Sequence, residues 1–238
     1  MIDTILFDLD GTLLKCSQEA FVRVYFSEIK KVFVDLGMDG DLAITAVWAG
    51  TKAMLTNDGT ELNSVKFWRM FAECLQLSDT DIVDIEAVCD RFYTNDFNKL
   101  KELMEPTDIP GRLINELNRK GYKLVLATNP VFPECAVHSR LFWIGLKPED
   151  FAHITHYANS SFCKPNLGYY QEIFNTIKKS PEQCLMIGNN PVEDMIVGKL
   201  GTDTYLVTDF LENETDLDIS AFRFGSLSDL EEYLLKQK

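Results

Sequence analysis

The first residues of the chain combine a short apolar run with an acidic turn. The apolar segment Thr4-Ile5-Leu6-Phe7 stops at Asp8-Leu9-Asp10-Gly11-Thr12. A compact apolar run that ends in a glycine turn is typical of a buried strand. We therefore predict a strand over residues 4–7, with polar side chains directly beyond its carboxyl end.

The segment that follows has the periodicity of helices. Apolar side chains recur at helical spacing over residues 21–36, 65–75 and 88–100. The first of these patterns ends at Gly37, and a second glycine follows at Gly40. Since no convincing strand pattern interrupts them, residues 15–105 are predicted to form an all-helical domain.

Beyond this domain, strand and helix patterns alternate. Apolar runs predict strands at residues 122–127, 151–154, 184–187 and 204–207. Amphipathic patterns predict helices at residues 110–117, 133–143, 169–177, the stretch up to Leu200, and 228–235. The acidic stretch 209–218 is predicted to be an exposed loop.

This alternation indicates a mostly parallel sheet that is covered by helices on both faces. Right-handed crossovers then make it a doubly wound, Rossmann-like α/β structure. A chain of 238 residues is long enough for one large core or for a core with a smaller appended domain. We expect a discontinuous α/β core of residues 1–14 and 106–238, into which the helical domain of residues 15–105 is inserted.

The composition and charge of the chain indicate which binding partners and which cellular compartment to expect. A formal net charge of −14 repels nucleic acid and anionic membrane surfaces. The first residues lack the pattern of a signal peptide, and no run approaches the roughly 18 apolar residues of a membrane span. Six scattered cysteines form neither C-x-x-C pairs nor zinc-type spacing with histidine. We expect a cytoplasmic protein that binds neither nucleic acid nor membranes.

Reactive groups gather where the predicted strands end. In open parallel sheets, ligands bind beyond the carboxyl ends of the strands. Each group alone has an ordinary explanation, such as a turn, a helix cap or a solvated charge. Their occurrence at four consecutive strand ends indicates a polar site. The groups are Asp8, Asp10 and Thr12, then Thr128 and Asn129, then Lys164, and finally Gly188-Asn189-Asn190 with Asp194.

These residues carry a resemblance to the haloacid dehalogenase-like superfamily. Its four motifs resemble Phe7-Asp8-Leu9-Asp10-Gly11-Thr12-Leu13, Thr128-Asn129, Lys164-Pro165 and Gly188-Asn189-x-x-x-x-Asp194. The first motif is highly specific, and the others occur in the right order after the right kind of element. The helical insertion resembles the cap that some members of the superfamily carry directly after the first strand.

The resemblance implies a magnesium-dependent hydrolase of phosphate esters in which Asp8 is the covalent nucleophile. Asp8 would attack phosphorus to form an aspartyl-phosphate, while its other oxygen and the backbone carbonyl of Asp10 hold Mg²⁺. Asp10 would protonate the leaving oxygen and later activate water, because a nucleophile cannot also donate a proton. The dehalogenases of the superfamily lack this second aspartate, so phosphate chemistry is favoured.

The other motifs imply ligands for the phosphate and the metal. Thr128 and the backbone N–H groups beside it suit a phosphate oxygen, and Lys164 balances the charge of Asp8 and of the transferring group. Asp194 would hold Lys164 or the waters of the metal in place. The expected phosphate ligands are Asp8, Thr128, Asn129 and Lys164. The expected metal ligands are Asp8, Asp10, Asn189 and Asp194.

Asn189 departs from the superfamily pattern, which usually has aspartate directly after the glycine of the last motif. An amide oxygen can bind Mg²⁺, but it lacks a full charge worth on the order of 4 kcal/mol at ~4 Å and an effective dielectric constant near ~20. We therefore expect a functional but weaker metal site, in which Asp194 or Glu193 could take over from Asn189.

The resemblance favours a phosphatase that acts on a small phosphorylated metabolite, because a covering domain leaves a closed cavity. Sugar phosphates, nucleotides and phosphoglycolate-like acids remain open as substrates. One alternative is a phosphomutase that uses the same Asp8 and Asp10. Another is a catalytically reduced phosphate-binding protein, which Asn189 suggests. In the helical domain we interpret Trp48 and Trp68 as packing residues and Lys52 and Arg69 as solvated charges.

Overall fold

The computed structural model describes residues 1–236 and contains one six-stranded sheet in the order β3-β2-β1-β4-β5-β6. All of its strand pairs are parallel. The doubly wound α/β class is therefore confirmed, and residues 237–238 of the predicted core lie outside the described part. The strands are β1 (Thr4–Phe7), β2 (Lys123–Leu126), β3 (His153–Ile154), β4 (Cys184–Gly188), β5 (Asp203–Val207) and β6 (Phe224–Gly225).

Helices cover both faces of the sheet because successive strand side chains point to opposite sides. Leu6 packs in one apolar cluster with α7 (Leu167–Ile177) and η4 (Met195–Leu200). Ile5 and Phe7 belong to the larger cluster on the other side. That cluster includes side chains of α5 (Ile109–Arg119), α6 (Glu134–Trp143) and α8 (Leu227–Lys236). Two short turns of 3-10 helix, η2 (Pro148–Asp150) and η3 (Pro181–Gln183), precede β3 and β4.

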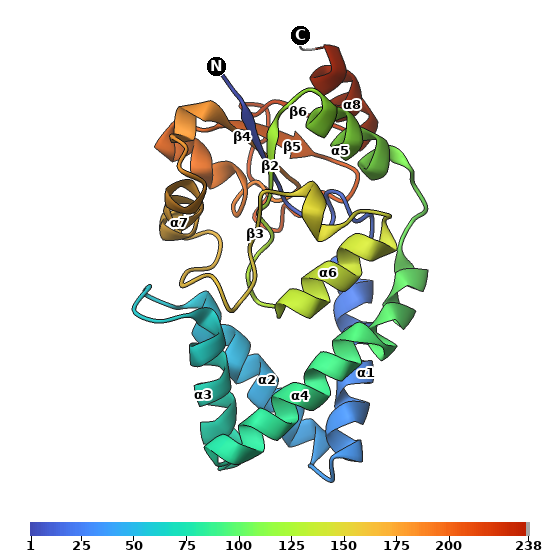
Figure 1. Cartoon of the computed structure of the whole chain (residues 1–238), viewed down its shortest axis with the longest axis vertical. Coiled ribbons are helices and arrows are strands. Elements are labelled where there is room, and N and C mark those ends of the chain that lie inside the picture. The colour runs from blue at the N-terminus through green and yellow to red at the C-terminus, as the bar shows by residue number, and fades with distance from the viewer. Residues whose placement is uncertain (237–238) are drawn as a thin grey trace.

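The helical domain lies on one side of the sheet, in the lower half of Figure 1. Polar residues cap its helices: Ser17, Asp39 and Ser78 each accept a backbone N–H from the first turn that follows. An all-helical cap is thus confirmed, while its boundaries at residues 15 and 105 stay predictions. Its elements are α1 (Gln18–Asp35), α2 (Gly40–Leu55), α3 (Asn63–Leu75), α4 (Asp79–Thr94) and η1 (Asp96–Leu103).

Several sets of contacts join the cap to the core, among them the following two. Where the chain enters and leaves the cap, Glu105 N donates to Lys15 O at 2.8 Å. At the start of α3, on the side of the cap that faces the core, the buried amide of Asn63 lies within 3.3 Å of the carbonyl oxygens of Pro130 and Phe162. The backbone N–H of Asn63 also donates to the carbonyl of a core loop. The cap is therefore held to the core where the chain enters and leaves it and again at the start of α3.

Some local predictions were wrong, for identifiable reasons. The helix α2 was missing from the predicted patterns; it begins at Gly40, where the Asp39 side chain accepts hydrogen bonds from the first N–H groups of the helix. The helix expected before Leu200 is a turn followed by the 3-10 helix η4. There the Asn190 side chain accepts the N–H groups of Val192 and Glu193, as a helix cap does, and the turn that follows continues as the 3-10 helix.

One strand was not predicted from the sequence. The two-residue strand β6 is too short to give a sequence pattern, and its pairing with β5 identifies it. None of the helices in residues 1–236 has the length and apolar character needed to cross a membrane.

The hydrogen bonds of Asn63 predict a stability effect. We expect Asn63→Ala to lower the free energy of unfolding by about 2 kcal/mol, because several buried partners lose their hydrogen bonds. Asn118→Ala is the matched control: this exposed amide makes one hydrogen bond, to Asp150 O, and its loss should cost less than about 1 kcal/mol. Urea unfolding measures both values, and equal losses would contradict the role of Asn63.

Candidate active site

The polar residues of the first and last motifs meet because β1 and β4 are neighbours in register. Phe7 pairs with Ile187, so Asp8 and Gly188 follow at the same edge of the sheet. From β1 the sheet continues to β2 on one side and to β4 on the other. Such a switch point leaves a crevice at the carboxyl ends of the strands, where ligands bind in sheets of this kind.

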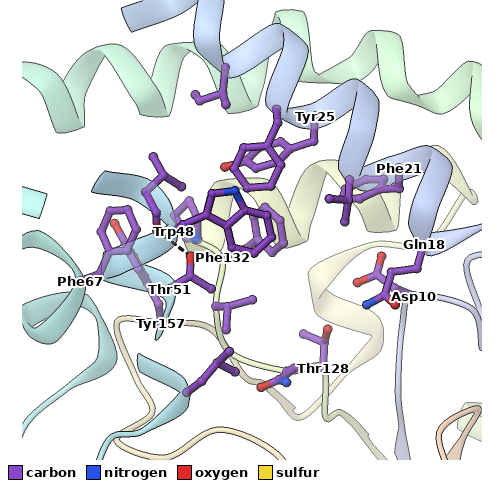
Figure 2. A pocket seen from close by; sticks show the side chains of 18 of the residues that line it. Asp10, Gln18, Phe21, Tyr25, Trp48, Thr51, Phe67, Thr128, Phe132 and Tyr157 are labelled. Atoms are coloured by element: carbon purple, nitrogen blue, oxygen red, sulfur yellow. Dashed lines mark hydrogen bonds between the residues drawn. The ribbon is translucent and has the colours of Figure 1, made fainter. Parts of the chain in front are cut away.

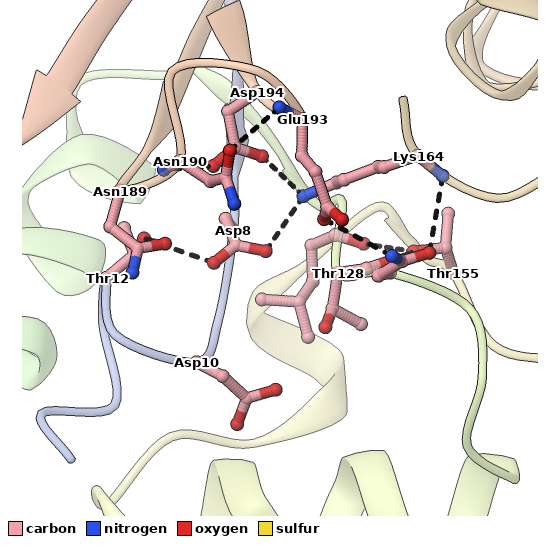
Figure 3. Close-up of polar contacts among 12 residues, drawn as sticks. Asp8, Asp10, Thr12, Thr128, Thr155, Lys164, Asn189, Asn190, Glu193 and Asp194 are labelled. Carbon is pink, nitrogen blue, oxygen red and sulfur yellow. Dashed lines mark hydrogen bonds and ion pairs between the residues drawn. The ribbon is translucent and has the colours of Figure 1, made fainter. Parts of the chain in front are cut away.

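Lys164 lies between two carboxylates at the centre of the site (Figure 3). Its Nζ is 2.8 Å from Oδ1 of Asp8 and 2.6 Å from Oδ1 of Asp194. Burial lowers the pKa of Lys164, but the carboxylates of Asp194 and Asp8 outweigh burial and raise that pKa well above its ordinary value. The ammonium group therefore stays charged and holds both carboxylates in place.

Asn189 is fixed so that its oxygen faces Asp8. Its Nδ2 donates to Phe210 O at 2.7 Å, so Oδ1 takes the opposite side, 3.4 Å from the Thr12 hydroxyl. That hydroxyl donates to Oδ2 of Asp8 at 3.1 Å. Gly11 allows this packing: a Cβ on it would lie 2.1 Å from Nδ2 of Asn189, and its φ of +75° is in the left-handed region. The oxygens of Asp8 and Asn189 thus converge near Thr12.

The second motif supports the site from the β2 side. Thr128 is buried, and its carbonyl accepts hydrogen bonds from the hydroxyls of Thr155 at 2.7 Å and Tyr169 at 2.9 Å. The amide of Asn129 joins two loops, since it accepts from Lys164 N and donates to the Glu193 carboxylate. These contacts fix the backbone there and leave the Thr128 side chain in the wall of the cavity.

Asp10 points away from the other carboxylates in Figure 3 and pairs with Arg140 of α6. The buried guanidinium group of Arg140 also lies 4.5 Å from the centre of the Phe132 ring. Burial raises the pKa of Asp10, and the charge of Arg140 opposes that rise. Oδ1 of Asp10 has no hydrogen-bond partner among the described residues. The sequence did not identify Arg140, whose only signal is a charge in a largely apolar helix.

Negative charge dominates the site. Burial raises the pKa of Glu193 to about 7, aided by the carboxylates of Asp194 and Asp8 and opposed by Lys164. Burial, followed by repulsion from Asp8, raises the pKa of Glu212 to about 7. Glu212 belongs to the acidic stretch that was predicted to be an exposed loop. It lines the cavity instead, because its backbone N–H donates to Asn189 O.

This surplus of carboxylates fits a divalent cation. No three His, Cys, Asp or Glu side chains in residues 1–236 already form a metal cluster. The oxygens of Asp8 and Asn189 are nevertheless hard ligands, and both lie within 3.4 Å of the Thr12 hydroxyl, so they are close together. A small hard cation that keeps several waters needs only one or two carboxylates from the protein. The donor set and the excess negative charge are therefore compatible with such an ion.

A cavity of about 320 Å³ extends from these polar groups into the cap. Asp10 and Thr128 lie on one side of it and Trp48 and Phe67 on another (Figure 2). Trp48 and Trp68 both line it, so they do more than the packing role we assigned them from the sequence. Lys52 does not line it, and Arg69 is paired with Glu61.

A parallel doubly wound sheet with carboxylates, a lysine and a threonine at its switch point, covered by a helical cap, defines a known class of hydrolases. The family model described as haloacid dehalogenase-like hydrolase matches residues 2–201. The chain therefore belongs to the haloacid dehalogenase-like hydrolase family, as the four motifs had indicated. A comparison with curated proteins finds no match.

Solved structures share the fold over nearly the whole chain. A predicted phosphoglycolate phosphatase from Haemophilus somnus is 16% identical, with a TM-score of 0.58 and 98% of each chain covered. The hydrolase YfnB from Bacillus subtilis, bound to magnesium, is 21% identical, with a TM-score of 0.57 and 98% of each chain covered. An L-2-haloacid dehalogenase from Xanthobacter autotrophicus is 14% identical, with a TM-score of 0.57 and 100% of each chain covered.

The structure brings most of the predicted site residues together, whereas their chemical roles stay predictions. Asp8, Lys164 and Asp194 are in direct contact, while Asp10 is held apart by its own partner. The other members, which lie in the wall of the same cavity, are Thr128, Asn129 and Asn189.

The pairing of Asp10 with Arg140 predicts a coupling energy. Arg140→Met should lower the free energy of unfolding by about 2–3 kcal/mol, because it leaves a carboxylate without its cation; this value allows for the one-third exposure of the Asp10 side chain. In an Asp10→Asn background the same substitution should cost at least about 1 kcal/mol less. Urea unfolding of the four proteins at pH 7 measures the difference. Equal costs in both backgrounds would show that the pair is not coupled.

Proposed function

We propose that this hydrolase is a magnesium-dependent phosphatase that removes phosphate from a small phosphate monoester through an aspartyl-phosphate on Asp8. The observation that carries the proposal is the fixed carboxylate of Asp8. It is held by Lys164 and Thr12 at the switch point of the sheet and lines a cavity. A nucleophile needs this combination of restrained geometry and access to substrate.

In the first step, Asp8 attacks phosphorus and the bond between phosphorus and the ester oxygen breaks. Asp8 is then esterified, and the substrate alcohol takes a proton from Asp10 as it leaves. The buried ammonium of Lys164 and the hydroxyl of Thr128 stabilise charge on the transferring group. Because Lys164 is already fixed by Asp194, this stabilisation needs no rearrangement when the reaction occurs.

In the second step, water attacks the aspartyl-phosphate and Asp10 takes the proton that water loses. Free phosphate leaves, and both aspartates return to their starting states. A proton acceptor and donor of this kind benefits from a raised pKa, and burial raises that of Asp10. Arg140 opposes the rise and also fixes the direction in which the Asp10 side chain points.

The metal ligands that we propose are the carboxylate of Asp8, the backbone carbonyl of Asp10 and the amide oxygen of Asn189. Mg²⁺ bound there would reduce the repulsion between the phosphate and the surrounding carboxylates. Asp194 is occupied by Lys164, so we assign it to positioning that lysine. The magnesium-bound relative YfnB shares this fold, which supports the choice of ion.

Replacing Asp8 tests the nucleophile. We expect Asp8→Asn to lower magnesium-dependent hydrolysis of phosphorylated metabolites at least about 1,000-fold, because an amide cannot form the aspartyl-phosphate. Asp35→Asn removes one exposed carboxylate at the end of α1 and should leave the rate unchanged. Phosphate release with and without Mg²⁺ measures both. If the original protein binds phosphate but releases none from any ester, the phosphate-binding alternative replaces the phosphatase.

The amide at position 189 predicts a weak requirement for metal. Half-maximal activity should need Mg²⁺ well above low micromolar, and Asn189→Asp should lower that concentration about tenfold, because it adds a full charge beside Asp8. The same variant should have a lower Tm in metal-free buffer, since it loses the hydrogen bond to Phe210 O. Magnesium titrations of activity and of Tm measure both effects, with Asn118→Asp as control. Saturation of the original protein at low micromolar Mg²⁺ would contradict this assignment.

A further inference from the structure

The part of the cavity that extends into the cap has an apolar, largely aromatic wall. Helices α1, α2 and α3 each contribute to it, and Phe132 closes it from the core side (Figure 2). Phe21, Tyr25 and Val47 are almost completely buried, whereas Trp48 is half exposed, so the wall is enclosed in part. Its apolar members include Phe21, Tyr25, Phe26, Val47, Phe67 and Trp68.

No cationic side chain of residues 1–236 lines this cavity. Lys164 lies behind Asp8 and Asp194, and Arg140 is turned to Asp10. An anionic group on the part of the substrate that is released would therefore find no counter-charge in the wall. It would instead meet apolar side chains at one end and carboxylates at the other, which is an unfavourable environment for an anion.

Several hydroxyl groups in the cap part of the wall already have hydrogen-bond partners. The hydroxyls of Tyr25 and Tyr93 form a mutual hydrogen bond of 2.7 Å. The hydroxyl of Tyr157 donates to Glu86 at 3.0 Å, and that of Thr51 donates to Val47 O at 2.9 Å. A sugar or nucleotide would bring several hydroxyl groups into this part of the cavity, where these hydroxyls are occupied and the other side chains are mostly apolar. Burying them there would cost free energy.

We infer that the group released by the enzyme is a compact, apolar alcohol that carries no anionic group, either aromatic or branched aliphatic. The inference rests on the proposed phosphatase function and narrows its substrate class. The phosphate lies at the carboxylate and lysine end, and the apolar part of the alcohol lies among the aromatic side chains of the cap. A bisphosphate, as a phosphomutase requires, has no place for its second phosphate. A cavity of about 320 Å³ is at the small end of ligand sites, which favours a compact molecule.

A pair of benzyl phosphates isolates the effect of charge on the released group. The para substituent is methyl or carboxylate, so the bond that breaks is nearly the same in both. We expect kcat/KM for the methyl compound to exceed that of the carboxylate at least about 20-fold. Equal values, or a preference for the carboxylate, would overturn the inference and leave the phosphatase intact.

A cation placed in the wall should reverse part of this preference. Thr51 lines the cavity on α2, and Thr51→Lys should lower the ratio of methyl to carboxylate kcat/KM about tenfold. Thr45→Lys is the matched control, because Thr45 lies on the same helix, is exposed, and makes the same bond to the carbonyl four residues earlier. The control should keep the original ratio. An unchanged ratio in Thr51→Lys would contradict the placement of the alcohol in the cap.

Failure of the phosphatase proposal would be visible separately. If none of the esters, and no other phosphorylated metabolite, is hydrolysed, that proposal fails and the assignment of a substrate fails with it. Binding of 4-methylbenzylphosphonate and 4-carboxybenzylphosphonate, followed by tryptophan fluorescence, is independent of turnover because Trp48 and Trp68 line the cavity. Tighter binding of the methyl compound supports the apolar site, and equal binding overturns it.

Discussion

The site depends on one buried cation between two carboxylates. Lys164 comes from the loop before α7, Asp8 from the end of β1 and Asp194 from the segment after β4. A buried ammonium group must be paired, so this interaction selects the relative positions of three distant segments. The same interaction restrains Asp8, so the ion pairs that stabilise the site also hold the proposed nucleophile in position.

Around this centre, the two halves of the molecule have different tasks. The parallel sheet provides charged groups whose positions follow from strand register. The cap provides apolar side chains whose positions follow from helix packing. Asn63 and the contact between Lys15 and Glu105 hold the two halves together, so the aromatic wall is set at a defined distance from Asp8. Selection of a substrate can therefore change with the cap while the chemistry of the sheet is kept.

Much of the fold and the principal site residues could be predicted because they depend on local sequence. The apolar run before Asp8 and the alternation of strands and helices have periods that a single sequence displays. Parallel pairing then brings the ends of those strands together without further information. This is why Lys164 and Asn189, which are far apart in the chain, could be assigned to one site.

The parts that could not be predicted depend on tertiary contacts. Whether Arg140 faces Asp10 or solvent is decided by the rotation of α6, which its composition does not fix. From the sequence, Glu212 belongs to an acidic stretch that is expected to be a solvated loop. Its backbone contact with Asn189 places it in the wall of the cavity instead. Each case is a long-range or side-chain contact that prevails over a local preference.

The short link between Lys15 and Glu105 has an architectural consequence. Since the two chain crossings lie side by side, the intervening helices form a closed excursion that begins and returns at one point of the sheet. Such an excursion can be shortened, lengthened or exchanged for another without disturbing strand order, because no strand of the described chain lies within it. The cap can therefore be replaced as one contiguous segment while the sheet and its polar site are kept, and such a replacement would change the substrate preference.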